Sequence, residues 1–292
     1  MEKRSAVKFI VAGGLNMFAN WKQIQTAAVE ADQLGYWGFV LPDHYMWGAD
    51  RGGNSTFETW TALTYLSAKT EKIRLGTLVT PIPFRPPGIL AKTVTTLDLL
   101  SNGRTILGVG AGWSQTEFEG YSEWNSNKIR VDKTREGLDL ILKLWTQDRV
   151  DFKGKFYHAN GAILDPKPAQ KPHPPLLFAG IGPRMLRMAG EYADICMIPA
   201  FPNIDNAKSR KIVMDEAHRR SRAGKISMAD MAPFPRSPES KYERKEYLNH
   251  VEAANEAGSK YFVAPFPPSN YLGSLLDFAE NIIPSFAQSH LD

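Results

Sequence analysis

The chain alternates short apolar or β-branched runs with longer segments of helical period, and this rhythm constrains its fold more than any other feature. The runs predicted to be strands are Val7–Ala12, Gly38–Leu41, Ile73–Val79, Thr105–Val109, Leu176–Ala179, Ile195–Ile198, Met228–Met231 and Tyr261–Ala264. Repeated strand and helix units predict a parallel sheet covered by helices. Eight units predict a (β/α)₈ TIM barrel of the α/β class, with residues 1–292 as one domain.

Residues that favour helix ends lie between these strands. Asn20 and Ser55 can cap two helices, and Pro86 and Pro87 suit the first turn of a third. Apolar periodicity predicts a fourth, long helix over 128–145.

The alternation of strands and helices is interrupted between the fourth helix and the fifth strand. Val150–Phe152 and Lys155–His158 resemble two short strands around a turn at Gly154. A proline-rich stretch then leads back to the next strand. We therefore predict a short surface insertion in the barrel.

Composition argues against several classes of protein. The only cysteine, Cys196, lies in an apolar run, which predicts a buried thiol rather than a disulfide framework. None of the six histidines has a metal-ligand spacing to another, so we expect no metal site. No stretch approaches the roughly 18 apolar residues of a membrane span, and we expect a cytoplasmic protein without a membrane partner.

The net charge of +4 is modest but uneven. Basic residues crowd one segment, at Lys208, Arg210, Lys211, Arg219, Arg220, Arg222 and Lys225. Asp215, Glu216 and apolar residues interrupt the run, as an amphipathic surface helix requires. We favour a solvated helix face over a nucleic-acid surface, and expect no nucleic-acid partner.

The C-terminal ends of barrel strands converge on one face, so the polar residues there are the candidates for chemistry. His44 follows the second strand, beside Asp43 and Tyr45 and near Trp47. A histidine in this setting can donate or accept a proton near neutral pH, and we take it as the catalytic candidate. The alternative is an ordinary loop histidine.

Glycines lie at the C-terminal ends of the third and fourth predicted strands. The segment 76–81 can form a bulge that supports one face of a planar ring, or an ordinary loop. The segment 107–113 carries three alternating glycines, which let a ligand or backbone come close. Its G-x-G-x-G spacing differs from the G-x-G-x-x-G of dinucleotide-binding folds, so it is no indication of that fold.

After the fifth strand, Gly180, Ile181 and Gly182 lead into Pro183 at a predicted helix start. Backbone N–H groups there can bind an anion, and Arg184 can add positive charge. A phosphate site is the favoured interpretation, and a turn that merely needs glycine is the alternative.

Together these segments resemble the luciferase-like family of flavin and deazaflavin oxidoreductases, the bacterial luciferase superfamily. The resemblance extends from Val7 to about Pro199. It rests on five segments in order: Pro42–His44, Leu75–Ala91, Thr96–Arg104, Leu107–Trp113 and Pro174–Gly182.

The resemblance implies a tricyclic ring across the strand ends, with its phosphate near Gly180–Gly182. It also implies a non-proline cis peptide, which carries over best to Leu78–Val79. The residues expected to border the cofactor are Asp43, His44, Thr77, Leu78, Val79, Gly110, Ala111, Gly112, Gly180, Ile181 and Gly182.

The His44 pair and the Gly-Ala-Gly-Trp segment resemble enzymes that use coenzyme F420, a deazaflavin, many of them labelled methylene-tetrahydromethanopterin reductases. Sugar-phosphate dehydrogenases of the family carry an acid where this chain has Trp113, so sugar phosphate is not the expected substrate. We expect hydride transfer to or from a small apolar substrate. Trp47, Phe84 and Trp113 would line its pocket, or pack in the core instead.

Two alternatives stay open. The same barrel can use reduced FMN and oxygen as a monooxygenase, or bind a cofactor without turnover. The resemblance also implies a homodimer.

Overall fold

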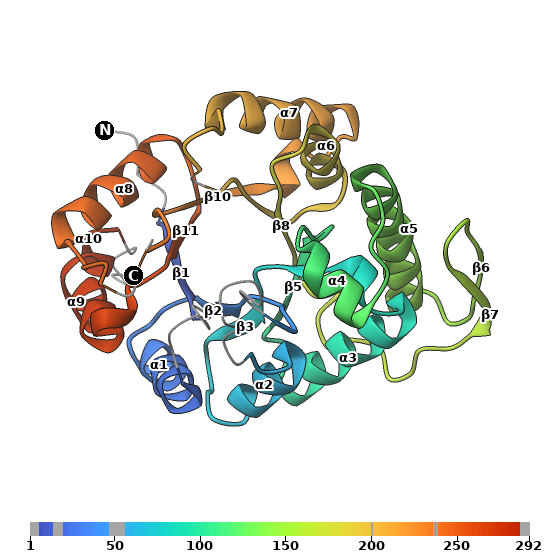
Figure 1. The fold of residues 1–292 in the computed structure, drawn as a ribbon, viewed down its shortest axis with the longest axis horizontal. Helices are drawn as coiled ribbons and strands as arrows, with labels where there is room; N and C mark the ends of the chain where they lie inside the picture. The colour runs from blue at the N-terminus through green and yellow to red at the C-terminus, as the bar shows by residue number, and fades with distance from the viewer. Residues whose placement is uncertain are drawn as a thin grey trace.

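The computed structural model describes residues 6–13, 20–46, 56–199, 201–235, 237 and 239–286. Eight parallel strands close into a barrel, because β3 pairs with β2 on one side and with β5 on the other. In ring order these are β1 (Lys8–Ala12), β2 (Gly38–Leu41), β3 (Arg74–Thr77), β5 (Thr105–Gly110), β8 (Leu176–Ala179), β9 (Ile195–Met197), β10 (Ser227–Met231) and β11 (Tyr261–Ala264). Figure 1 looks down this ring. The predicted TIM barrel is confirmed.

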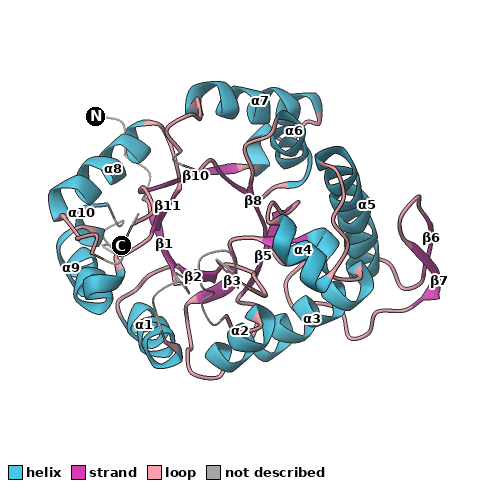
Figure 2. Cartoon of the chain, in the orientation of Figure 1, coloured by secondary structure: helices cyan, strands magenta, loops and turns pink. Residues whose placement is uncertain are grey.

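Helices surround the strands, as Figure 2 shows in cyan. They are α1 (Trp21–Gln33), α2 (Thr59–Ser67), α3 (Pro87–Leu100), α4 (Gln115–Tyr121), α5 (Asn127–Thr146), α6 (Pro183–Tyr192), α7 (Asn206–Arg219), α8 (Arg244–Glu256), α9 (Tyr271–Asn281) and α10 (Ile283–Phe286). Short 3₁₀ turns are η2 (Ile82–Phe84), η3 (Ala223–Lys225) and η4 (Pro268–Asn270).

The strands divide the core into two layers because successive side chains point to opposite faces. On β1, Ile10 belongs to the apolar cluster inside the barrel, together with residues such as Val40 and Val263. Its neighbours Phe9 and Val11 belong to the larger cluster between the barrel and the helices. Both faces of each strand are therefore buried, as parallel sheets require.

The predicted helix starts are confirmed with one exception. Asn20 caps α1 in a reciprocal capping box, and α3 begins at Pro87. Ser55 lies outside the described residues, and α2 begins only at Thr59. The Glu58 carboxylate caps that helix by accepting the N–H of Thr61, so the placement of the cap at Ser55 was wrong.

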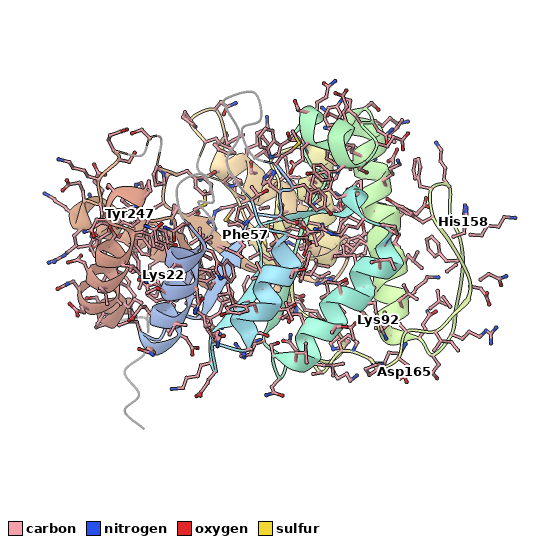
Figure 3. The ribbon with its side chains drawn as sticks, turned by 60° about the horizontal axis from the view of Figure 1, so that its bottom comes forward. Lys22, Phe57, Lys92, His158, Asp165 and Tyr247 are labelled. Atoms are coloured by element: carbon pink, nitrogen blue, oxygen red, sulfur yellow. The ribbon has the colours of Figure 1, made fainter. Side chains whose placement is uncertain are left out.

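The insertion is a two-stranded antiparallel hairpin, β6 (Val150–Lys153) and β7 (His158–Ala162). It projects beyond α5 in Figure 1, and His158 lies on this arm in Figure 3. The prediction of the second strand at Lys155–His158 was wrong by several residues. The carboxylate of Glu136 on α5 accepts the N–H groups of residues 155, 156 and 157 at 2.7–3.0 Å, so these groups form the turn instead of a strand ladder.

Most of the basic segment lies on α7, as predicted, with Val213 and Ala217 buried, whereas Arg220, Arg222 and Lys225 follow the end of this helix. Several of its cations are paired: Arg210 with Asp230, and Arg219 with Glu216. Cys196 is a buried free thiol on β9. Within the described ranges, no helix has both the length and the apolar character needed to cross a membrane.

Candidate active site

A cavity of about 840 Å³ lies at the C-terminal ends of the strands. Its lower wall contains Ala12, Val40, Ala179 and Met197, each from the end of a different strand. Most of its lining is apolar, and its polar side chains include His44, Glu117, Asn127 and Arg130. This is the face on which TIM barrels carry their active sites.

The cavity gathers most of the residues that the sequence singled out. His44, Leu78, Val79, Gly110, Ala111, Gly112, Phe84, Trp113, Gly180, Ile181 and Gly182 all line it. Asp43 and Thr77 do not, and Trp47 lies outside the described residues. The structure therefore joins four separate loops into one site.

Asp43 lies behind the cavity wall in a buried ion pair. Its two carboxylate oxygens accept hydrogen bonds from Arg85 at 2.7 and 2.8 Å, and Thr80 donates a third at 2.7 Å. Burial lowers the pKa of Arg85, but the charge and hydrogen bonds of Asp43 outweigh it and raise that pKa above its ordinary value. The carboxylate thus anchors the end of β2 and does not line the cavity.

Thr77 also acts behind the wall. Its hydroxyl oxygen accepts the N–H of Gly108 at 3.1 Å and joins β3 to β5. One residue further on, the peptide bond Leu78–Val79 is cis, as predicted, and both residues line the cavity. The chain then returns to the sheet as β4 (Thr80–Pro81), which pairs with the end of β5.

Gly112 is required by both its backbone and its surroundings. Its φ is +78°, a conformation that favours glycine, and an added Cβ would lie 2.3 Å from the Phe118 ring. This close approach lets α4 pack directly over the end of β5.

His44 pairs with Glu117 of α4, which the sequence analysis did not single out. The His44 Nδ1 lies 2.7 Å from Glu117 Oε2, and Glu117 Oε1 accepts the N–H groups of Tyr45 at 2.5 Å and Met46 at 3.2 Å. Glu117 is buried. Its carboxylate therefore holds residues 44–46, which follow β2.

An aromatic cluster fixes α4 in this position. The ring centroids of Phe84 and Phe118 are 4.3 Å apart, and Tyr45 packs against Phe84 at 5.2 Å and Tyr121 at 4.9 Å. The ring centroids of His44 and Trp113 are 5.8 Å apart, in an edge-to-face arrangement.

A short motif could have revealed Glu117. Ser114-Gln115-Thr116-Glu117 has the S-x-x-E pattern that is typical of a helix start. In the structure Ser114 makes no side-chain cap, and Glu117 turns to His44 instead.

Arg130 of α5 is a second residue that sequence reasoning missed. It lines the cavity, only 5% exposed, and its guanidinium lies 3.8 Å from the Trp124 ring centroid. It donates to the carbonyls of Gly112 and Asn125 and to the Asn127 side chain. Burial lowers its pKa, and no carboxylate among the described residues forms an ion pair with it. A buried cation without an anion is suited to an anionic ligand.

The start of α6 faces the same cavity. Gly182 is its N-cap and has no side-chain cap, and an added Cβ there would meet nothing within 4 Å. Arg184, expected to add charge, instead pairs with Asp132 and donates to the Lys128 carbonyl, and it does not line the cavity. Positive charge at the cavity wall comes from Arg130 instead.

Exposed apolar side chains ring the cavity. Trp113, Ile181, Phe201 and Phe234 are 67%, 45%, 45% and 38% exposed, and all four line it. We call these four residues the apolar rim. They come from the loops after β5, β8, β9 and β10.

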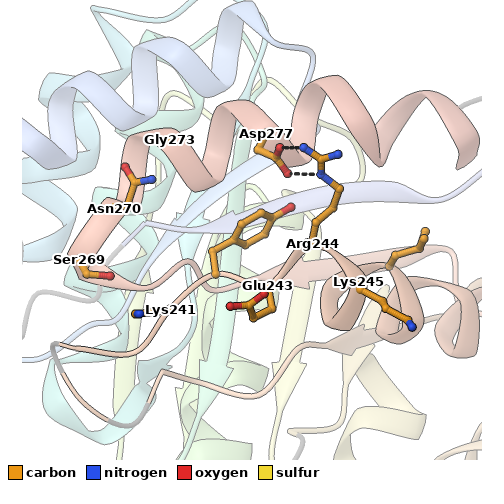
Figure 4. A pocket seen from close by; sticks show the side chains of 10 residues that line it. Lys241, Glu243, Arg244, Lys245, Ser269, Asn270, Gly273 and Asp277 are labelled. Carbon is orange, nitrogen blue, oxygen red and sulfur yellow. Dashed lines mark hydrogen bonds and ion pairs between the residues drawn. The ribbon is translucent and has the colours of Figure 1, made fainter.

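A second hollow of about 890 Å³ lies between the starts of α8 and α9 (Figure 4). Arg244 donates two hydrogen bonds to Asp277 there, and these lower the pKa of Asp277. The Arg244 cation is thus already paired, whereas Arg130 has no carboxylate partner among the described residues. The hollow shares no lining residue with the first cavity.

Comparison with known proteins agrees with this architecture. Over 172 residues the chain is 36% identical to the F420-dependent glucose-6-phosphate dehydrogenase of Amycolatopsis mediterranei, which covers 57% of this chain and 50% of that protein. The chain thus matches about half the length of this relative.

Two solved structures share the fold. An F420-dependent secondary alcohol dehydrogenase in complex with an F420–acetone adduct superimposes with a TM-score of 0.81 at 22% identity, covering 95% of this chain and 98% of the other. The F420-dependent tetrahydromethanopterin reductase of Methanopyrus kandleri gives 0.74 at 18% identity, covering 97% and 99%. The family model for luciferase-like monooxygenases matches residues 6–261. With the barrel, the cis peptide and the strand-end cavity in place, this match means that the chain belongs to the luciferase-like monooxygenase family.

Proposed function

We propose that the chain is a deazaflavin-dependent oxidoreductase, which uses coenzyme F420 to transfer a hydride to or from a small apolar alcohol or carbonyl compound. The observation that carries this proposal is the cavity, which combines apolar walls, the buried cation of Arg130 and a histidine. The relatives support the choice of cofactor, because the matched dehydrogenase and both structural neighbours are named as F420-dependent.

The cavity residues fit such a cofactor. Leu78, Val79, Gly110 and Ala111 line the cavity with small or apolar groups and would hold a planar ring. Arg130 and the N–H groups at the start of α6 suit a phosphate, because helix N-termini and guanidinium groups both bind this anion. A volume of about 840 Å³ is within the usual range for cofactor sites.

When bound, F420 supplies the ring carbon that accepts or returns the hydride. His44 takes the proton that leaves an alcohol oxygen as its C–H bond gives up the hydride, and returns that proton in the reverse direction. A carboxylate can only accept hydrogen bonds, so neutral His44 donates from Nδ1 to Glu117 and carries its lone pair on Nε2. The apolar walls exclude water from this exchange.

The apolar rim supports an uncharged, apolar substrate. A sugar phosphate needs hydroxyl and phosphate partners, whereas Trp113, Ile181 and Phe234 offer hydrocarbon surface. The glucose-6-phosphate activity named for the relative is therefore not proposed here. We also propose that the chain works as one domain, as a cytoplasmic homodimer.

Binding titrations of the purified protein with F420 and with FMN test the cofactor. We expect saturable binding of F420, and hydride transfer to it from a secondary alcohol, followed by the change in deazaflavin absorbance. Tight FMN binding without F420 binding, with oxygen consumed by the reduced FMN form, would favour a monooxygenase. Binding without turnover over a broad panel of alcohols and ketones would favour a non-catalytic barrel.

A further inference from the structure

We infer that Glu117 is a positioning residue, which sets the proton arrangement of His44 and the orientation of its ring. The inference rests on the proposed role of His44 in proton exchange. It starts from the buried carboxylate of Glu117, which contacts three consecutive residues after β2: His44, Tyr45 and Met46.

The geometry makes the carboxylate specific for one form of the ring. Glu117 Oε1 receives two backbone N–H groups, and Oε2 lies 2.7 Å from His44 Nδ1. An acceptor supported by backbone donors on its other oxygen favours an N–H at Nδ1. The same negative charge stabilises the imidazolium that forms when Nε2 takes a proton.

The carboxylate of Asp43, the residue before His44, is already compensated. The Asp43 carboxylate is held by Arg85, which also donates to Glu58 of α2. Burial raises the pKa of the Tyr45 hydroxyl to about 12, so this neighbour stays neutral. Arg130 of α5 lines the same cavity. Among the described residues, the Glu117 carboxylate contacts the His44 ring directly, 2.7 Å from its Nδ1.

The position of Glu117 is built into the fold. Phe118, its neighbour on α4, is fully buried against Phe84 and under Gly112. This packing fixes the carboxylate independently of any ligand, so the tautomer of His44 is set before substrate binds.

Glu117→Gln tests the inference, because it keeps the size of the side chain and removes its charge. We expect kcat to fall about 100-fold with little change in KM. We also expect the limb of the pH profile that depends on His44 to move to lower pH, since loss of the carboxylate disfavours the protonated ring. Glu117→Asp restores the charge and should return that limb toward its original pH. Glu119→Gln, an exposed change on the same helix, is the matched control and should leave the profile in place.

A double-mutant cycle separates positioning from general stability. In a His44→Ala background, Glu117→Gln should have no further effect on kcat. Equal losses from Glu117→Gln in both backgrounds, with an unmoved pH profile, would overturn the inference.

The ring nitrogens give a readout that needs no turnover. In the ¹⁵N-histidine spectrum of the cofactor-free protein, assigned with His44→Ala, His44 should carry its proton on Nδ1. In Glu117→Gln this preference should be lost, and a retained Nδ1 proton there would overturn the inference. This measurement decides the role of Glu117 even if the enzyme turns over with FMN instead of F420.

Discussion

Arg85 donates two hydrogen bonds, of 2.7 and 2.8 Å, to the buried carboxylate of Asp43. Asp43 directly precedes His44, the histidine that lines the cavity. The side chain of Asp43 is fully buried and that of Arg85 is 12% exposed.

Arg85→Met should destabilise the fold by about 3–5 kcal/mol, because it leaves the Asp43 charge buried without its partner. Chemical denaturation measures the loss. Glu58→Gln removes the more exposed partner of Arg85 and should cost no more than about 1 kcal/mol. Equal losses from the two variants would contradict a dominant role for the buried pair.

Arg130→Met should weaken F420 binding about 10- to 100-fold, because one charged hydrogen-bond donor to the phosphate is lost. The phosphate-free deazaflavin riboside should bind both proteins alike, which separates phosphate binding from ring binding. Arg184→Met removes a cation that pairs with Asp132 outside the cavity, and should leave F420 affinity unchanged. If Arg184→Met weakened F420 binding more than Arg130→Met, Arg184 would be the residue that binds the phosphate.

Gly112→Ala should destabilise the protein by about 2–4 kcal/mol, because alanine is strained at positive φ and its Cβ would overlap Phe118. Thermal unfolding checks the loss. The displaced Phe118 should carry Glu117 with it, so His44-dependent turnover should fall as well. Gly224→Ala, where an added Cβ meets nothing within 4 Å, is the control. Unchanged stability of Gly112→Ala would show that α4 can shift freely.

Phe234→Ser should raise KM for bulky secondary alcohols about tenfold and leave F420 affinity unchanged, because an aromatic contact at the rim is lost. Leu276→Ser, on α9 and similarly exposed, should change neither quantity. Better turnover of glucose 6-phosphate than of apolar alcohols by the unaltered enzyme would refute the substrate class.

Cys196 should resist thiol reagents until the protein unfolds. Burial raises its pKa to about 12, so the thiolate that reacts is scarce at pH 8. We expect no modification of the native protein and one thiol per chain in denaturant, measured by absorbance. Rapid labelling without denaturant would mean that the barrel opens near β9.

The barrel could be predicted because most of its strands are short apolar runs, of three to six residues in the structure, separated by segments of helical period. Its cavity could be predicted because strand ends in such a barrel converge. The cis peptide at Leu78–Val79 followed from the family resemblance alone.

Other features depend on contacts between distant segments. Glu117 meets His44 across 73 residues, and α4 is too short to show an apolar period. Asp43 was expected to border the cofactor. In the structure Arg85, which lies 42 residues further along the chain, binds its carboxylate behind the cavity wall. Arg184 was expected to add positive charge to the phosphate site. Its ion pair with Asp132 could not be predicted, because Asp132 lies 52 residues away in the sequence.

The segment from Trp113 to Tyr121 combines several functional residues in one continuous stretch of the chain. Its nine consecutive residues include Trp113 of the apolar rim, Glu117, which pairs with His44, and Phe118, which is buried under Gly112. One exchange of this loop would alter substrate access and proton chemistry together, while Leu78 and Val79 keep their place in the cavity wall. New reactivity can therefore arise on this scaffold without rebuilding the strands.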